Sequence, residues 1–237
     1  MINPSEKNHA AYPSVIAIDG PAASGKTTVG TLLAEKLGYL CLDTGVMYRA
    51  VALQALLEGV PVCDEESVTK LAESLAIDVL PASKQDGRPF DVMINGVDQT
   101  WKIRTEDVNS NVSEVSVYAG VRLAMTEKQR IIARHGKIIM LGRDIGTVVL
   151  PDADLKIYLD AAVEVRARRR YEEELKLGKT VKYDDVLASL KHRDKLDSGR
   201  TVAPLKPAED SLIINTDHLS VFEVVENILE LIDNSAD

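Results

Sequence analysis

The chain has 237 residues, of which 45% are hydrophobic, and its formal net charge is −9. This length suffices for one well-buried core with a small inserted subdomain, but not for two full domains. The acidic balance argues against a general binder of nucleic acid or anionic membranes, because such partners need a basic surface.

The segment before the first predicted element shows no targeting signal. Residues 1–14 lack the apolar stretch of a signal peptide, and no apolar run approaches the roughly 18 residues that span a bilayer. We therefore expect a cytoplasmic protein with a flexible tail at residues 1–14. Neither Cys41 nor Cys63 has metal-type spacing, and we assign no function to either.

Strand and helix patterns alternate after the tail. A continuous apolar run predicts a buried strand at residues 15–18, and apolar residues at helical spacing predict a helix at residues 27–37. The same patterns recur as a strand at 39–42 and a helix at 46–57. This order is typical of a parallel sheet.

The pattern changes at residues 62–105. Apolar residues alternate with other types from Phe90 to Ile94, and the Asn95-Gly96 pair that follows is the strongest short signal for a β-hairpin. We expect this segment to be a small inserted subdomain. Residues 15–61 and 106–237 would then form the core.

Alternation returns in the rest of the chain. Helical periodicity covers residues 106–134 with a break near Gly120. Further strands are predicted at 138–141, 155–159 and 212–214, and further helices at 163–177, 183–196 and 221–232. Five buried strands joined by right-handed crossovers predict an α/β fold with a doubly wound five-stranded parallel sheet, whose ligands bind at the carboxyl ends of the strands.

A phosphate-binding loop lies between the first predicted strand and the first helix, where the pattern G-x-x-x-x-G-K-[ST] is matched. In such a loop backbone N–H groups surround phosphate oxygens, Lys26 on its solvent-facing loop reaches the β- and γ-phosphates, and the Thr27 hydroxyl coordinates Mg²⁺. We expect MgATP here. The expected ATP-binding residues are Gly20, Pro21, Ala22, Ala23, Ser24, Gly25, Lys26, Thr27 and Thr28.

Arginines gather in the C-terminal third of this acidic chain. Stabilising a transferred phosphoryl group requires cations, so the gathering suggests an anionic ligand. The alternative is a solvated helix face paired with neighbouring glutamates, which is our interpretation of Arg168. The remaining arginines of the group are Arg166, Arg169, Arg170, Arg193 and Arg200.

Two further polar clusters follow predicted strands. Asp43-Thr44-Gly45 opens a helix that carries Arg49 one turn later, which suits a second anion site. An ordinary N-cap by Asp43 or Thr44 would explain the same residues, and both interpretations can hold together. The second cluster, Arg143-Asp144, stands at a strand end, where ligands bind.

As a set, these residues resemble bacterial cytidylate kinases, members of the nucleoside monophosphate kinase group, over nearly the whole chain. The resemblance rests on several motifs and departs at Thr44, where the family often has serine. The motifs are Asp19-Gly20-Pro21, Asp43-Thr44-Gly45 with Tyr48-Arg49, Ile103-Arg104-Thr105, Gly142-Arg143-Asp144-Ile145-Gly146-Thr147-Val148-Val149, and Arg193-Asp194 with Asp197, Arg200 and Pro204-Leu205.

The resemblance implies that ATP is the donor, that CMP or dCMP is the acceptor, and that residues 62–105 are the CMP-binding insert. The implied CMP contacts are Thr44, Arg49 and Arg143 at the phosphate, Ser113, Arg122 and Asp144 at cytosine, and Arg193 and Asp197 near the ribose.

The resemblance also implies a helical lid at about residues 163–200, with Arg166 and Arg170 against ATP. We expect these two arginines to become ordered only with both substrates bound, because a lid must open to admit ATP. The implied catalytic cations are Lys26, Arg143, Arg166, Arg170 and Arg200.

Two other functions stay open. The chain could phosphorylate another small acceptor, such as AMP, UMP or shikimate, or it could be a regulatory P-loop ATPase without an acceptor. No Asn-Lys-x-Asp motif supports a GTPase. We expect a monomer that acts in pyrimidine nucleotide metabolism and has no nucleic-acid or membrane partner.

Overall fold

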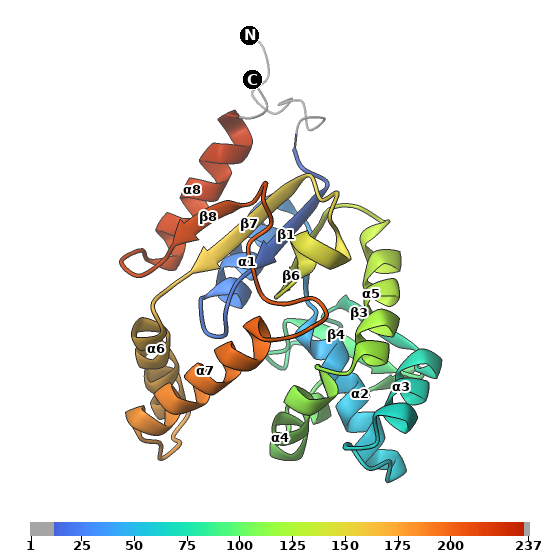
Figure 1. Cartoon of the computed structure of the whole chain (residues 1–237). Coiled ribbons are helices and arrows are strands. Elements are labelled where there is room, and N and C mark those ends of the chain that lie inside the picture. The colour runs from blue at the N-terminus through green and yellow to red at the C-terminus, as the bar shows by residue number, and fades with distance from the viewer. Residues whose placement is uncertain (1–11, 235–237) are drawn as a thin grey trace. The chain divides into compact units, whose positions relative to one another are not determined.

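The computed structural model describes residues 12–234 (Figure 1). The predicted tail at 1–14 lies mostly outside the described residues. Contacts divide the chain into two compact units. Unit 1 comprises residues 1–41 and 136–237, and unit 2 comprises residues 42–135.

A five-stranded sheet forms the centre of unit 1, with strand order β2-β6-β1-β7-β8. The pairings of β1 with β6, β1 with β7, and β7 with β8 are parallel, so the predicted α/β fold with a five-stranded parallel sheet is confirmed. Strand β2, at one edge of the sheet, contains the boundary between the units, which falls between Cys41 and Leu42. The bounds are β1 Val15–Asp19, β2 Leu40–Asp43, β6 Ile138–Gly142, β7 Leu155–Asp160 and β8 Leu212–Asn215.

Helices α1 (Lys26–Leu37) and α8 (Val221–Asn234) pack on this sheet and enclose the main core of unit 1 (Figure 1). The core joins Leu33 of α1 and Ile228 of α8 to apolar residues of β1, β6 and β7. The phosphate loop follows the carboxyl end of β1, and Arg143-Asp144 follows that of β6, the edge where a parallel sheet binds ligands.

Two helices and one short turn complete unit 1. Helices α6 (Val163–Lys176) and α7 (Tyr183–Ser198) pack on each other, and their small apolar core also contacts Ala22 and Ala23 of the phosphate loop. A single π-helical turn, η3 (Ile145–Val149), follows β6, where no helical element is predicted.

Unit 2 combines helices with a three-stranded antiparallel sheet of order β3-β4-β5. Asn95 and Gly96, with φ of 50° and 76°, form the predicted hairpin turn. The bounds are α2 Gly45–Glu58, α3 Glu65–Ser74, β3 Ile77–Pro81, β4 Phe90–Ile94, β5 Val97–Asp98, η2 Lys102–Arg104, α4 Glu106–Val115 and α5 Ala119–Ala133.

Unit 2 includes more of the chain, residues 42–135, than the 62–105 segment expected as an insert. The difference arises because α2 packs on α3 and α4, and α5 packs on α3, so that these helices share one unit. Helix α3 has no counterpart among the predicted elements. Among the described residues, no helix combines the length and apolar character needed to cross a bilayer.

Candidate active site

The phosphate loop joins β1 to α1 as the sequence predicts. Gly20 is buried at φ 148°, and a Cβ there would lie 2.2 Å from the carbonyl oxygen of Leu159. Gly25 has φ 94° at the start of α1. Both conformations favour glycine over other residues. All residues expected at ATP lie in this loop or in the first turn of α1, where Thr27 and Thr28 are exposed.

Lys26 is folded back onto its own loop. Its Nζ donates to the carbonyl oxygens of Gly20 at 2.7 Å and Pro21 at 2.6 Å, and to Ser24 Oγ at 3.3 Å. The residue is only 7% exposed, so the expectation of a stem on a solvent-facing loop is wrong. The loop carbonyls converge on the ammonium and enclose the stem, because a buried charge requires hydrogen-bond partners.

Asp19, the last residue of β1, connects the phosphate loop to the turn after β6. Its Oδ1 accepts from the backbone N–H of Ile145 at 2.8 Å, and its Oδ2 accepts from that of Gly146 at 2.7 Å. Burial raises the pKa of Asp19 to about 6, although these two N–H groups act in the opposite direction. The carboxylate therefore caps the η3 turn, which directly follows Arg143 and Asp144.

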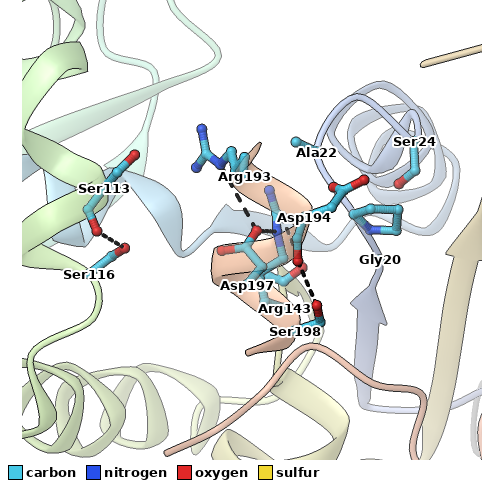
Figure 2. A network of polar contacts seen from close by, with 12 residues as sticks. Gly20, Ala22, Ser24, Ser113, Ser116, Arg143, Arg193, Asp194, Asp197 and Ser198 are labelled. Atoms are coloured by element: carbon cyan, nitrogen blue, oxygen red, sulfur yellow. Dashed lines mark hydrogen bonds and ion pairs between the residues drawn. The ribbon is translucent and has the colours of Figure 1, made fainter. Parts of the chain in front are cut away.

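Asp197 of α7 lies near three of the predicted arginines in unit 1, and Figure 2 shows Arg143 and Arg193 beside it. Arg143 Nε donates to Asp197 Oδ2 at 2.9 Å, and Arg200 Nη2 donates to Asp197 Oδ1. Arg193 Nε lies 4.0 Å from Oδ2. Asp197 is 2% exposed, and its burial acts to raise its pKa. The charges of Arg143, Arg200 and Arg193 outweigh burial and hold the pKa of Asp197 below its usual value.

Asp144, expected at the cytosine, directly follows Arg143 in the chain and is buried. It is 5% exposed, and its backbone carbonyl accepts from Val148 at 2.9 Å and Val149 at 3.1 Å in the η3 turn. Its negative charge contributes to the raised pKa of Asp19. The turn therefore fixes the backbone at and directly after Asp144.

Arg166 is held tightly at the start of α6. Its guanidinium donates twice to Asp194 of α7, at 3.1 and 2.6 Å, and to the carbonyl oxygens of Ala161 at 2.9 Å and Ala22 at 3.1 Å. The residue is 4% exposed. Asp194 and the phosphate loop thus supply acceptors for the Arg166 guanidinium within the protein, and the ordering of Arg166 by substrates stays a prediction.

Arg170 is placed differently, one turn farther along α6. Its Nε donates to Glu174 at 2.8 Å and its Nη1 to Glu173 at 3.0 Å, and 43% of its side chain is exposed. This is the pairing with neighbouring glutamates that the sequence leaves open as an alternative. Arg169 turns instead to Thr216, whose hydroxyl it contacts at 3.1 Å.

Unit 2 carries the other residues expected at CMP. Thr44 is buried before α2, where Asp43 Oδ1 accepts from Gly45 N–H at 3.0 Å and the Thr44 carbonyl accepts from Met47 N–H at 3.1 Å, so both residues shape the start of the helix. Arg49 Nη1 donates to Asn109 Oδ1 at 2.5 Å and to the Ile103 carbonyl at 3.2 Å. Arg49 is thereby connected to η2 and α4.

The two residues expected at cytosine in unit 2 lie on either side of the break between α4 and α5. Arg122 Nη1 donates to the Ser116 carbonyl at 3.1 Å, and its guanidinium lies 5.5 Å from the Tyr48 ring centroid. The Ser116 hydroxyl donates to the Ser113 carbonyl at 2.9 Å (Figure 2). Tyr48 and Ser116 thus orient Arg122 within unit 2.

Several residues that orient the site are absent from the predicted site set. Asp19 and Asp194 both lie inside motifs of the family resemblance. For Asp19 the available signal was a carboxylate directly after a buried strand. Asn109 carries no such signal, because an asparagine in an amphipathic helix is ordinarily a surface residue.

Comparisons with known proteins give one consistent result. The sequence profile of the cytidylate kinase family matches residues 16–234. A cytidylate kinase from Bacillus licheniformis is 47% identical over 93% of this chain and 96% of its own length, and one from Herpetosiphon aurantiacus is 47% identical over 93% and 94%. A cytidylate kinase from Bacillus subtilis is 45% identical over 93% and 97%.

Among solved structures, a shikimate kinase from Acinetobacter baumannii in complex with shikimate is 21% identical, with a TM-score of 0.45, over 94% of each chain. This value is too low to support a conclusion.

Proposed function

This chain belongs to the cytidylate kinase family, and from that premise we propose that it transfers the γ-phosphoryl group of ATP to CMP or dCMP. The products are ADP and CDP or dCDP, which places the reaction in pyrimidine nucleotide metabolism. A phosphate oxygen of CMP attacks the γ-phosphorus, the bond to the β-phosphate oxygen breaks, and ADP leaves. The reaction requires no general base, because the phosphate dianion of CMP is already a nucleophile.

The main structural support for this proposal is the arrangement of cations in unit 1. The phosphate loop and the predicted catalytic arginines belong to the same unit, and two carboxylates of α7, Asp194 and Asp197, already pair with three of these arginines. Phosphoryl transfer depends on positioning and on cations around the transferred oxygens. The proposed catalytic cations are Lys26, Arg143, Arg166, Arg170 and Arg200.

The proposed contacts of CMP are assigned residue by residue, as the family resemblance implies. In unit 1, Arg143 would contact the phosphate, Asp144 the cytosine, and Arg193 and Asp197 the ribose. In unit 2, the phosphate contacts would be Thr44 and Arg49, and the cytosine contacts Ser113 and Arg122. The 62–105 segment remains the proposed CMP-binding insert and 163–200 the proposed lid.

The residues at the phosphate loop fit magnesium supplied with ATP. Thr27 is exposed at the start of α1, and no group of three or more His, Cys, Asp or Glu side chains that could hold a metal ion occurs within residues 12–234. Mg²⁺ commonly keeps several waters and binds through substrate phosphates, so one protein hydroxyl is a suitable contribution. When bound, Mg²⁺ neutralises charge on the β- and γ-phosphates.

A coupled assay of ADP release over a panel of nucleoside monophosphates tests the proposal. We expect rapid turnover with CMP and dCMP, and much slower turnover with AMP and UMP. Preference for another acceptor would replace the proposed substrate. ATP consumption without a phosphorylated product would instead favour a regulatory ATPase.

The Lys26→Ala variant serves as the negative control in this assay. Losing the ammonium should reduce kcat by about 100-fold or more, since one electrostatic contact to a transition state is worth that much. Circular dichroism checks that the variant is folded. Turnover within about tenfold of the parent, roughly 1.4 kcal/mol of barrier, would contradict the assignment of the phosphate loop.

We also propose a monomer that works in the cytoplasm, where its nucleotide substrates occur. Mass photometry of the purified protein tests the first part, and fractionation of cells that express a tagged chain tests the second.

A further inference from the structure

Asp194 is the residue that fixes Arg166 in unit 1. Its two carboxylate oxygens accept from both terminal nitrogens of the guanidinium, the bidentate geometry that positions arginine most firmly. The ion pair is largely buried, with 5% of the Arg166 side chain and 27% of the Asp194 side chain exposed. A charge pair this deep restricts the guanidinium far more than a surface pair would.

The contacts of Arg166 leave a donor for a ligand. A guanidinium has five N–H groups. Four of them donate to Ala161, Ala22 and the two oxygens of Asp194. Within residues 12–234, the second hydrogen on Nη2 has no protein acceptor. Nη1 also donates to the Ala22 carbonyl, so the guanidinium as a whole lies beside the phosphate loop.

Helix α7 presents a second carboxylate one turn after Asp194. Asp197 holds Arg143 and Arg200, so one face of α7 orients arginines that come from α6, from the end of β6 and from the segment after α7 itself. Figure 2 shows Asp194 and Asp197 on this helix, with Arg143 beside Asp197. Residues three apart lie on the same helix face. The two carboxylates therefore arrange cations that would otherwise repel one another.

We propose that Asp194 is a positioning residue for phosphoryl transfer, which holds Arg166 so that its remaining Nη2 hydrogen meets the transferred phosphate. The inference rests on the proposed function. Asp194 acts through Arg166 and needs no contact with the nucleotide. An arginine fixed in advance loses little entropy when the transition state forms, which is the benefit of preorganisation.

Two variants separate positioning from charge alone. Asp194→Asn removes the charge and one acceptor, and Asp194→Glu keeps the charge but lengthens the side chain by one methylene. We expect kcat for CMP to fall by about 10- to 100-fold in both, because a misplacement near 1 Å can cost that much. The KM values for ATP and CMP should stay within about twofold of the parent, since the proposed role of Asp194 is exerted through Arg166 and not through contact with a substrate.

Asp210→Asn is the matched control. Asp210 is also paired with a cation, Lys156 at 2.7 Å, but 67% of its side chain is exposed. Its kcat should equal that of the parent. If Asp194→Asn does not fold, the glutamate variant still decides the matter, because it leaves no unpaired buried charge.

A double-mutant cycle with Arg166→Gln shows whether Asp194 acts through Arg166. We expect Asp194→Glu to cost nothing further in the Arg166→Gln background, because the residue that it positions is gone. Losses that multiply would overturn the inference, as would a parental kcat in both Asp194 variants. A raised kcat or a lowered KM for ATP in the Asp194 variants would also overturn it, because Asp194 would then compete with the phosphate for Arg166.

The parent enzyme distinguishes this failure from failure of the proposed function. If the parent leaves CMP unphosphorylated, the proposed function is wrong and the role of Asp194 is overturned with it. If the parent phosphorylates CMP and the Asp194 variants match it, only the positioning role is wrong.

Discussion

The buried carboxylate of Asp19 links protonation to stability at the scale of one residue. Burial raises its pKa to about 6, and the charge of Asp144 adds to this, whereas Lys26 and the N–H groups of Ile145 and Gly146 oppose it. An unfolded aspartate has a pKa of about 3.9. The folded state therefore binds the proton more tightly than the unfolded state does, so this contribution to stability decreases as pH rises from about 4 to 6.

We predict that Asp19→Asn reveals this dependence. A shift of about two pKa units corresponds to roughly 3 kcal/mol. The unfolding free energy of the parent minus that of the variant should fall by up to about this amount between pH 4 and pH 6, and should be constant above pH 7. Urea unfolding of both proteins across this range measures it. A difference that does not vary with pH would mean that Asp19 does not titrate there.

Asp144 offers a test of base recognition at the same scale. Cytosine presents an amino donor at N4, whereas uracil presents a carbonyl oxygen there, so a carboxylate suits cytosine and leaves uracil with two facing acceptors. The mismatch and the misplaced N3 hydrogen should together favour CMP over UMP by about 100-fold in kcat/KM.

We predict that Asp144→Asn loses activity selectively on CMP. The amide keeps the shape of the carboxylate but can flip to donate to O4 of uracil. Activity on UMP should therefore stay level or rise while activity on CMP falls. Steady-state kinetics on both substrates measure the change. Equal losses on both would mean that Asp144 only supports the η3 turn and that the base is recognised elsewhere.

At the scale of elements, a buried arginine stabilises the small sheet of unit 2. Arg88 Nη1 donates to Asp91 at 2.7 Å and to Asp98 at 2.8 Å, and its Nη2 donates to Asp86 at 2.8 Å. Its side chain is 3% exposed. These contacts connect the loop after β3 with β4 and β5, and hydrogen bonds from Arg88 hold the pKa values of Asp86 and Asp98 below their usual range.

We predict that Arg88→Met destabilises the protein, because it leaves neighbouring carboxylates without their cation. The melting temperature should fall by about 5 °C or more. Lys84→Gln is the matched control, since Lys84 pairs with the same Asp98 but is 60% exposed and should matter little. Differential scanning calorimetry compares the three proteins. Equal melting temperatures would show that the arginine contributes nothing net.

At the scale of the whole molecule, α6 and α7 form the segment proposed to close over ATP. Their shared apolar core contacts the phosphate loop at Ala22 and Ala23, and Arg166 fastens the start of α6 to the same loop. This anchorage restricts motion near Arg166. Greater freedom is expected at the outer end of the pair, where Arg170 and the residues after it lie.

We therefore predict that ATP and CMP together raise hydrogen-exchange protection most strongly in residues 171–190. Protection near Arg166 should change less, and α8 serves as the control that should not change. Measurements with no ligand, each substrate alone and both substrates separate the contributions. Equal protection of residues 163–200 with and without both substrates would contradict a closing lid.

Local patterns in the sequence determined much of this protein. Continuous apolar runs predicted the five strands, Gly38 marked the end of α1, and Asn95-Gly96 marked the hairpin. The phosphate loop also followed from its own residues. These features depend on neighbours in the chain, since turn conformation and the spacing of apolar residues are set within a short stretch of sequence.

The partners of the charged residues were decided only by the tertiary structure. Arg166 and Asp194 are 28 residues apart, Arg143 and Asp197 are 54 apart, and Asp19 and Ile145 are 126 apart. An arginine pattern shows that a cation is present but not which carboxylate holds it. That choice follows from the packing of α6 and α7 and from the parallel pairing of β1 with β6, which bring distant residues within hydrogen-bond distance.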